Sequence, residues 1–224
     1  MLGEAVGGLL PSAIAVALSP IPVVGVVLVL GTPRARTSGI AFAAGWVVGL
    51  AALSTIVVLA LGSGVDSGTE SGIEWFKVAV GIAFLAMAAQ QWRKRPRDGD
   101  GAEMPKWMDS IAAVTAPRAA ALGAALSGAN PKNLALTLAA SASISEAGLG
   151  RADTALAIVV YVALGSVTVS GSVLFYLSGP ARAARPLAAV GRFMSENSAV
   201  ITMVVLLLLG AKLLGDGLGG VASL

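Results

Sequence analysis

A single lysine inside an apolar part of the chain is the strongest candidate for chemistry. Lys132 directly follows Asn130 and Pro131 in a long apolar run, and no acidic residue occurs within thirteen positions of it. A lysine at the centre of a membrane helix costs about 2.5 to 3.5 kcal/mol, so such residues usually serve a function. Lys132 therefore predicts an internal site for an anionic group such as a phosphate, a sulfate or a carboxylate.

Two proline-containing breaks interrupt apolar runs, and we expect each to open a half-helix. The first is Ser19-Pro20-Ile21-Pro22, and the second is the segment Asn130-Pro131-Lys132-Asn133. Proline removes a backbone donor, whereas a Ser or Asn before it is a good N-cap and proline itself is favoured at the first helical position. Two such amino termini that converge would offer free backbone donors and partial positive charge to an anion. Either break taken alone is also compatible with a simple kink.

The predicted substrate site combines polar and proline residues of both breaks with a serine just before the second break and a tryptophan of the second apolar run. These residues are Ser19, Pro20, Pro22, Ser127, Asn130, Pro131, Lys132, Asn133 and Trp46. Trp46 lies beside Gly45 and Gly49, which allow close helix packing, and it could line a cavity. In the structural alternative, Lys132 only ties the two breaks together by hydrogen bonds.

The elements that must position these residues are six apolar runs, each long enough or nearly long enough to cross a hydrocarbon core of about 30 Å. They are Ala5–Leu30, Ser38–Leu61, Trp75–Trp92, Ala119–Ile144, Thr154–Leu177 and Ser198–Leu214. With 56% hydrophobic and 12% charged residues, the composition also indicates a membrane protein. Hydroxyls within the runs, such as those of Ser54 and Thr168, are expected to bond carbonyls of their own helices. The predicted fold is all-α and polytopic, with six transmembrane helices.

The two breaks divide the chain into similar halves. Pro20 and Pro131 each lie in the first run of a three-run half, and three crossings invert the second half relative to the first. Inverted repeats of this kind are common in secondary transporters, which bind substrate where the repeats meet. We expect a single transmembrane domain over 1–224, with repeat 1 at about 1–92, a cytoplasmic loop at about 93–118 and repeat 2 at about 119–224.

Basic residues predict the orientation. The first, third and fifth gaps between runs hold two, six and three of the fifteen Lys and Arg residues. The positive-inside rule makes these gaps cytoplasmic, and both chain termini are then extracytoplasmic. The basic charge therefore reflects orientation and membrane lipids rather than nucleic acid.

The composition argues against several classes of enzyme. The chain has no Cys and no His, so thiol redox chemistry, haem ligation and histidine-based catalysis are not expected. The acidic residues lie in gaps or at run ends, which argues against a buried carboxylate relay. We expect no catalytic residue, no metal site and no cofactor.

The motifs also resemble a known family. The segment LSPIP at 18–22, the segment SGANPKN at 127–133 and the segment AFAAGW at 41–46 are similar to the LysE superfamily of small exporters. Within it, the chain most resembles the actinobacterial Gap group of glycopeptidolipid-addressing and sulfolipid-addressing proteins. The resemblance implies a location in the bacterial plasma membrane and export across it. In this group the implied cargo is cell-envelope glycolipids or their precursors, and in the wider superfamily it is amino acids.

Two classes of function follow. The first is a secondary exporter that moves an anionic or amphipathic molecule by alternating access between inverted repeats. The second is a membrane adaptor that transports nothing itself and holds a larger lipid-export assembly together with lipid-synthesis or lipid-export proteins. Either class is compatible with a homo-oligomer.

Overall fold

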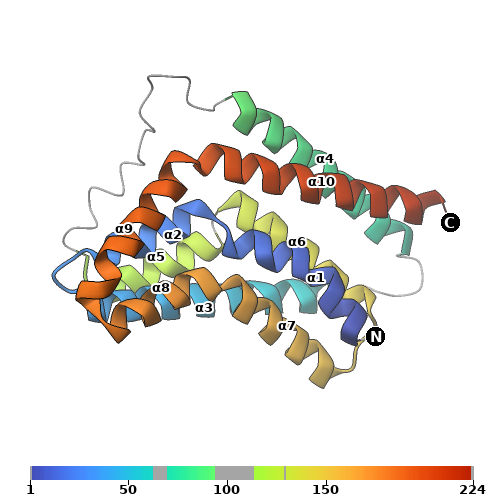
Figure 1. Ribbon diagram of the computed structural model, residues 1–224. Coiled ribbons are helices and arrows are strands. Elements are labelled where there is room, and N and C mark those ends of the chain that lie inside the picture. Colours follow the sequence, from blue (N-terminus) through green and yellow to red (C-terminus); the bar gives the residue numbers. More distant parts are fainter. Residues whose placement is uncertain (1, 63–69, 94–113, 129, 223–224) are drawn as a thin grey trace.

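The computed structural model describes residues 2–62, 70–93, 114–128 and 130–222, and within these ranges every regular element is a helix (Figure 1). In chain order the ten helices of this described part are α1 (Leu2–Ala17), α2 (Pro20–Leu30), α3 (Ala35–Gly62), α4 (Glu70–Arg93), α5 (Ala116–Gly128), α6 (Pro131–Glu146), α7 (Arg151–Gly165), α8 (Val167–Ser178), α9 (Pro180–Glu196) and α10 (Ser198–Ala222). The all-α prediction is confirmed for these ranges. Most of the predicted cytoplasmic loop, residues 94–113, lies outside them.

Length and apolarity identify fewer spans than the six predicted. Two single helices are long and apolar enough to cross a membrane, over Ala35–Ala60 in α3 and over Ser198–Ala222 in α10. Two bent pairs qualify as broken spans: α1 with α2, bent by 48°, and α7 with α8, bent by 59°. The described helices therefore contain two candidate spans, or up to four if each bent pair is one span. Helix α4 and the pair of α5 and α6 occupy the remaining predicted runs without meeting the same criterion.

Both predicted proline breaks are present. Helix α1 ends at Ala17 and α2 begins at Pro20, while α5 ends at Gly128 and α6 begins at Pro131. The N-cap residues have almost the same extended backbone, with φ −72° and ψ 114° at Ser19 and φ −76° and ψ 117° at Asn130. An extended residue followed by proline starts a new helix because proline cannot donate to the preceding turn.

A third break was not predicted. The run Thr154–Leu177 was expected to be one helix, but α7 ends at Gly165 and α8 begins at Val167. The Thr168 hydroxyl donates to the Ala17 carbonyl at 2.6 Å, so the prediction that it bonds its own helix was wrong. Ala17 ends α1, and its carbonyl has no helical partner across the first break, so the contact with α8 satisfies it. Ser54 does bond its own helix, at 2.7 Å to the Leu50 carbonyl.

Helix α9 occupies a segment that was predicted to be a gap between runs. Its buried residues, Ala183, Leu187 and Gly191, recur every four positions, and the helix packs against α2 and α8. A Cβ added at Gly191 would lie 2.9 Å from Cγ1 of Val27 in α2, so this contact is close. The four-residue period is present in the sequence, but basic residues between these positions make the segment resemble a cytoplasmic gap.

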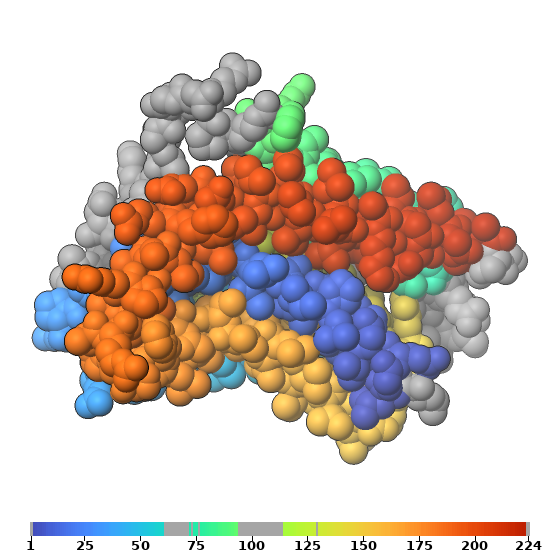
Figure 2. Space-filling model, viewed as in Figure 1, coloured from blue at the N-terminus to red at the C-terminus, as the bar shows by residue number. Residues whose placement is uncertain are grey.

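The helices form two groups (Figure 1). Helices α4 and α10 run side by side, and their axes are close because a Cβ on Gly81 would lie only 2.8 Å from the backbone nitrogen of Leu214. In the second group α3 packs on α5, and α1 packs on α6 and α7. The α4–α10 pair touches this larger group through much smaller contacts. Figure 2 shows α10 next to α1 on the visible face.

Charges separate toward the two ends of the bundle. The start of α1 and the end of α10 lie at the same end of the bundle as the start of α4 and the end of α6 (Figure 1). There Lys77 of α4 forms ion pairs with Glu74 at 2.9 Å and with Glu146 of α6 at 3.0 Å. The opposite side holds the starts of α3 and α5 and the whole of α9, with arginines such as Arg36 and Arg118. The Lys77–Glu146 pair thus links the α4–α10 pair to the larger group at the acidic end.

Candidate substrate-binding site

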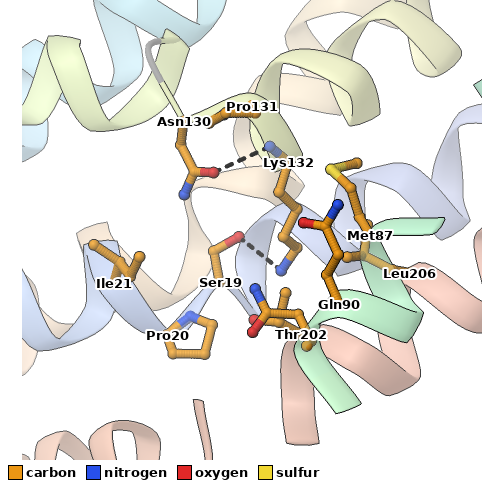
Figure 3. A pocket seen from close by; sticks show the side chains of 11 residues that line it. Ser19, Pro20, Ile21, Met87, Gln90, Asn130, Pro131, Lys132, Thr202 and Leu206 are labelled. Atoms are coloured by element: carbon orange, nitrogen blue, oxygen red, sulfur yellow. Dashed lines mark hydrogen bonds between the residues drawn. The ribbon is translucent and has the colours of Figure 1, made fainter. Parts of the chain in front are cut away.

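The two proline breaks meet inside the protein and are joined by hydrogen bonds. The Nζ of Lys132 donates to the Ser19 hydroxyl at 3.2 Å (Figure 3). That hydroxyl donates to Oδ1 of Asn133 at 2.8 Å. The Asn133 amide in turn donates to the Leu126 carbonyl at 3.1 Å. Leu126 lies in the last turn of α5, so one chain of hydrogen bonds runs from the start of α2 through α6 to the end of α5.

The two breaks use their N-cap residues differently. Oδ1 of Asn130 accepts from the backbone nitrogen of Lys132 at 3.1 Å, which caps α6 locally. The Ser19 side chain makes no capping hydrogen bond to α2. It points across the break instead and serves the buried lysine.

Lys132 is buried, and no described carboxylate pairs with it. Only 6% of its surface is exposed, and within the described ranges Ser19 is the one hydrogen-bond partner of its ammonium group and no ion pair includes it. An ammonium group has three donors, so two remain for a ligand or water. Because a buried charge without a counter-ion is expensive, an anion bound here would relieve a large desolvation cost.

A cavity of about 170 Å³ lies beside this ammonium group. Its walls come from the two breaks and from the α4–α10 pair, and they comprise Ser19, Pro20, Ile21, Met87, Gln90, Gln91, Asn130, Pro131, Lys132, Thr202 and Leu206. Figure 3 shows the Lys132 side chain extending from α6 toward Ser19, with side chains of α4 and α10 on the other side. The cavity therefore lies where the two helix groups face each other.

Five of the nine predicted site residues line this cavity: Ser19, Pro20, Asn130, Pro131 and Lys132. The other four lie elsewhere for different reasons. Asn133 supports Ser19 from outside the cavity, and Pro22 is buried in the first turn of α2.

Ser127 and Trp46 belong to the packing between α3 and α5. The Ser127 hydroxyl donates to the Ala124 carbonyl at 2.8 Å, and it occupies the space that a side chain on Gly49 would need. Trp46 is fully buried and does not line the cavity. Its backbone nitrogen would lie 2.9 Å from a Cβ on Gly123, which confirms the close helix packing predicted for this region.

The wall that α4 and α10 contribute was not predicted from the sequence. Gln90 and Gln91 are adjacent amides near the end of α4, and Thr202 lies in the second turn of α10. The glutamines stand just before a basic gap, where polar residues commonly end an apolar run. Two neighbouring amides in an otherwise apolar run were the feature of the sequence that could have indicated a contribution of α4 to the cavity wall.

The arrangement is suited to an anion that carries an apolar part. The half-helices α2 and α6 both begin at the cavity, so their amino termini add partial positive charge to that of Lys132. Ile21, Met87 and Leu206 give the same cavity apolar surface. In the described part of the chain no three His, Cys, Asp or Glu side chains gather in a way that would hold a metal ion.

Comparison with known families agrees with the resemblance seen in the motifs. A family model described as Sap, sulfolipid-1-addressing protein, matches residues 9–219. The chain belongs to this family. The match includes both breaks and every residue of the cavity wall, and membership implies a role in lipid export or addressing rather than a known enzymatic activity. No curated protein and no solved structure gives a significant match.

Proposed function

We propose that this protein is a secondary exporter of an anionic, amphipathic envelope lipid, such as a sulfated glycolipid or its precursor, in the bacterial plasma membrane. One observation carries the proposal: the buried Lys132 ammonium has no carboxylate partner among the described residues and lies beside a cavity at the start of two half-helices. The family match favours a lipid over an amino acid as cargo.

The cavity is large enough for a headgroup. Its volume of about 170 Å³ is similar to the roughly 150 Å³ of an engineered cavity that holds one benzene molecule, so one sulfate or phosphate ester is of a suitable size. The oxygens of the bound ester would accept hydrogen bonds from Nζ of Lys132, from an amide of Gln90 or Gln91 and from the Thr202 hydroxyl. The acyl chains would stay in the bilayer while the charged group passes the midplane.

The proposed topology has six spans in two inverted repeats. Repeat 1 comprises α1 with α2, then α3, then α4, and repeat 2 comprises α5 with α6, then α7 with α8, then α10. The matching backbone at Ser19 and Asn130 supports this symmetry, as does the pairing of α4 with α10, the third span of each repeat. The arginines at one end and the carboxylates at the other support termini on the extracytoplasmic side.

Alternating access would be a movement of the α4–α10 pair against the larger group, because the contacts between them are among the smallest in the bundle and the cavity lies there. In this structure the Lys77–Glu146 ion pair joins the two groups at the end where both termini lie. In the proposed movement, outward release would require this ion pair to open.

A cross-link tests this movement directly, since the natural chain has no cysteine to interfere. The K77C/E146C variant is treated with a short, cleavable cross-linker that reacts with thiols. We expect it to lose export completely and to recover export when the linker is cleaved. Each single-cysteine variant under the same treatment is the control. Full export by the cross-linked double variant would contradict the proposed movement.

Lys132→Met tests the site. Methionine is similar in length but uncharged. We therefore expect export of a sulfated glycolipid by proteoliposomes to fall about tenfold to a hundredfold, which corresponds to the loss of one charge-assisted hydrogen bond of about 1.5 to 3 kcal/mol. Lys212→Met is the matched control, because Lys212 is exposed and pairs with Asp216 near the end of α10. Both variants should insert and purify as the wild type does.

The adaptor hypothesis has an observation of its own. The hydrogen bonds from Lys132 through Ser19 and Asn133 to α5 tie the two breaks together, as a purely structural lysine would. The adaptor function is favoured if the wild type exports no lipid in proteoliposomes and cells that carry K132M still deliver the cargo to their surface. Lys132 would then have only a structural role.

A further inference from the structure

Helix α9 presents a basic face that the cavity does not use. Arg182, Arg185 and Arg192 are all exposed, and their spacings of three and seven residues place them on one side of the helix. The opposite side, with Ala183, Leu187 and Gly191, packs on the protein. The basic face therefore points away from the helix bundle.

Nothing in the described part of the chain neutralises these arginines. No ion pair within the described ranges includes any of the three, although Glu196 follows Arg192 by one helical turn. Beside them lie two exposed apolar side chains, Val190 at 42% and Phe193 at 58% of their surface. Arginines next to an exposed aromatic residue are typical of helices that lie in a membrane interface.

The neighbouring helices determine where this face can lie. Helix α8, in one of the bent pairs that qualify as a span, ends two residues before α9, and the candidate span α10 begins two residues after it. Helix α9 itself is not among the candidate spans. A helix held between two spanning elements must lie near the membrane surface. Here that surface is at the end of the bundle that also holds the arginine-bearing starts of α3 and α5.

We propose that this face of α9 binds the anionic headgroups of membrane phospholipids, with the three arginines on the phosphates and Phe193 at the boundary of the acyl chains. Arginine suits phosphate because its planar guanidinium group can donate two parallel hydrogen bonds. The proposal depends on the membrane placement of α8 and α10 and not on transport through the cavity. It gives the protein a second lipid-binding surface, on α9 beside the half-helix α2.

The test measures lipid preference in the full chain. Purified protein in a nonionic detergent is titrated with short-chain phosphatidylglycerol or phosphatidylcholine, and bound lipid is counted by native mass spectrometry. Each basic residue near an anionic surface contributes about fivefold in affinity, so the wild type should prefer phosphatidylglycerol and the R182Q/R185Q/R192Q variant should bind it about a hundredfold more weakly. The wild-type preference should also fall as salt is raised.

Matched variants distinguish this face of α9 from the other basic positions of the protein. The R34Q/R36Q variant removes charge from the same end of the bundle, R151Q removes it from the opposite end, and R182K/R185K/R192K keeps the charge of α9. All three should retain most of the preference. Loss of the preference in R34Q/R36Q to the same degree, or its survival in the triple glutamine variant, would overturn the proposal. Loss only in K132M would place the lipid in the cavity, which overturns the role of α9 while leaving the proposed transport site intact.

Discussion

The first and second proline breaks have the same backbone and opposite chemistry. At each, an extended N-cap residue precedes a proline, so Ser19 corresponds to Asn130 and Pro20 to Pro131. The next position is Ile21 in the first half and Lys132 in the second, and both line the cavity. One half thus supplies an apolar wall and the other the charge. The difference teaches that a symmetric scaffold can hold an asymmetric, amphipathic ligand if only one repeat carries the ionic group.

Removing the charge at position 132 gives the largest expected effect. Lys132→Ile makes both breaks apolar, and we expect binding of a sulfated glycolipid to weaken by about tenfold to a hundredfold, since a charge-assisted hydrogen bond is lost. The double variant I21K/K132I returns the charge on the other wall and should recover part of that loss. Binding can be followed in nanodiscs by microscale thermophoresis, with an uncharged glycolipid as the control ligand.

A double variant no better than K132I alone would count against the symmetry. It would mean that the position of the ammonium, held by Ser19, matters as much as its presence in the cavity. Equal binding by the wild type and K132I would contradict the proposed anion site.

Ser19→Ala should have the next largest effect, on stability. The change leaves the Lys132 ammonium and the Asn133 amide oxygen without the hydroxyl that both now contact. An unsatisfied buried polar group costs about 1 to 3 kcal/mol, more for a charged one, so the free energy of unfolding should fall by at least that amount. Thermal unfolding in detergent measures it, with Ser178→Ala, an exposed serine at the end of α8, as the control. An unchanged unfolding midpoint would show that water replaces the hydroxyl.

Asn130→Ala should cost less, because among the described residues the one hydrogen bond of the Asn130 side chain caps its own helix. Loss of an N-cap residue typically costs about 1 kcal/mol. The comparison is sharpest when Asn130→Ala and Ser19→Ala are measured under the same conditions and again in the K132M background. There the cost of Ser19→Ala should shrink, whereas that of Asn130→Ala should stay the same. A cost of Asn130→Ala that depends on Lys132 would mean that both caps serve the lysine.

Much of this site was predictable because proline chemistry is local. Pro20 and Pro131 cannot donate to the preceding turn, and Ser19 and Asn130 are good caps, so the two breaks follow from four-residue windows. The break after Gly165 could not be predicted in this way. It accompanies the bond from Thr168 to the Ala17 carbonyl, and these residues are 151 positions apart. The cavity wall on α4 was missed for a similar reason, since nothing near Gln90 in the sequence indicates that it faces Lys132.

By itself, the sequence determined the family, the helical class, the places where two helices restart and the presence of a lysine in an apolar run. Those properties depend on residue type and on spacings of a few positions. Only the tertiary structure decided that Ser19 and Lys132, 113 positions apart, share a hydrogen bond, that Trp46 packs against α5 rather than lining the cavity, and that α4 and α10 close the cavity from the other side. The physical reason is that burial and hydrogen-bond partners depend on which helix faces lie against each other, and local residue patterns do not specify this.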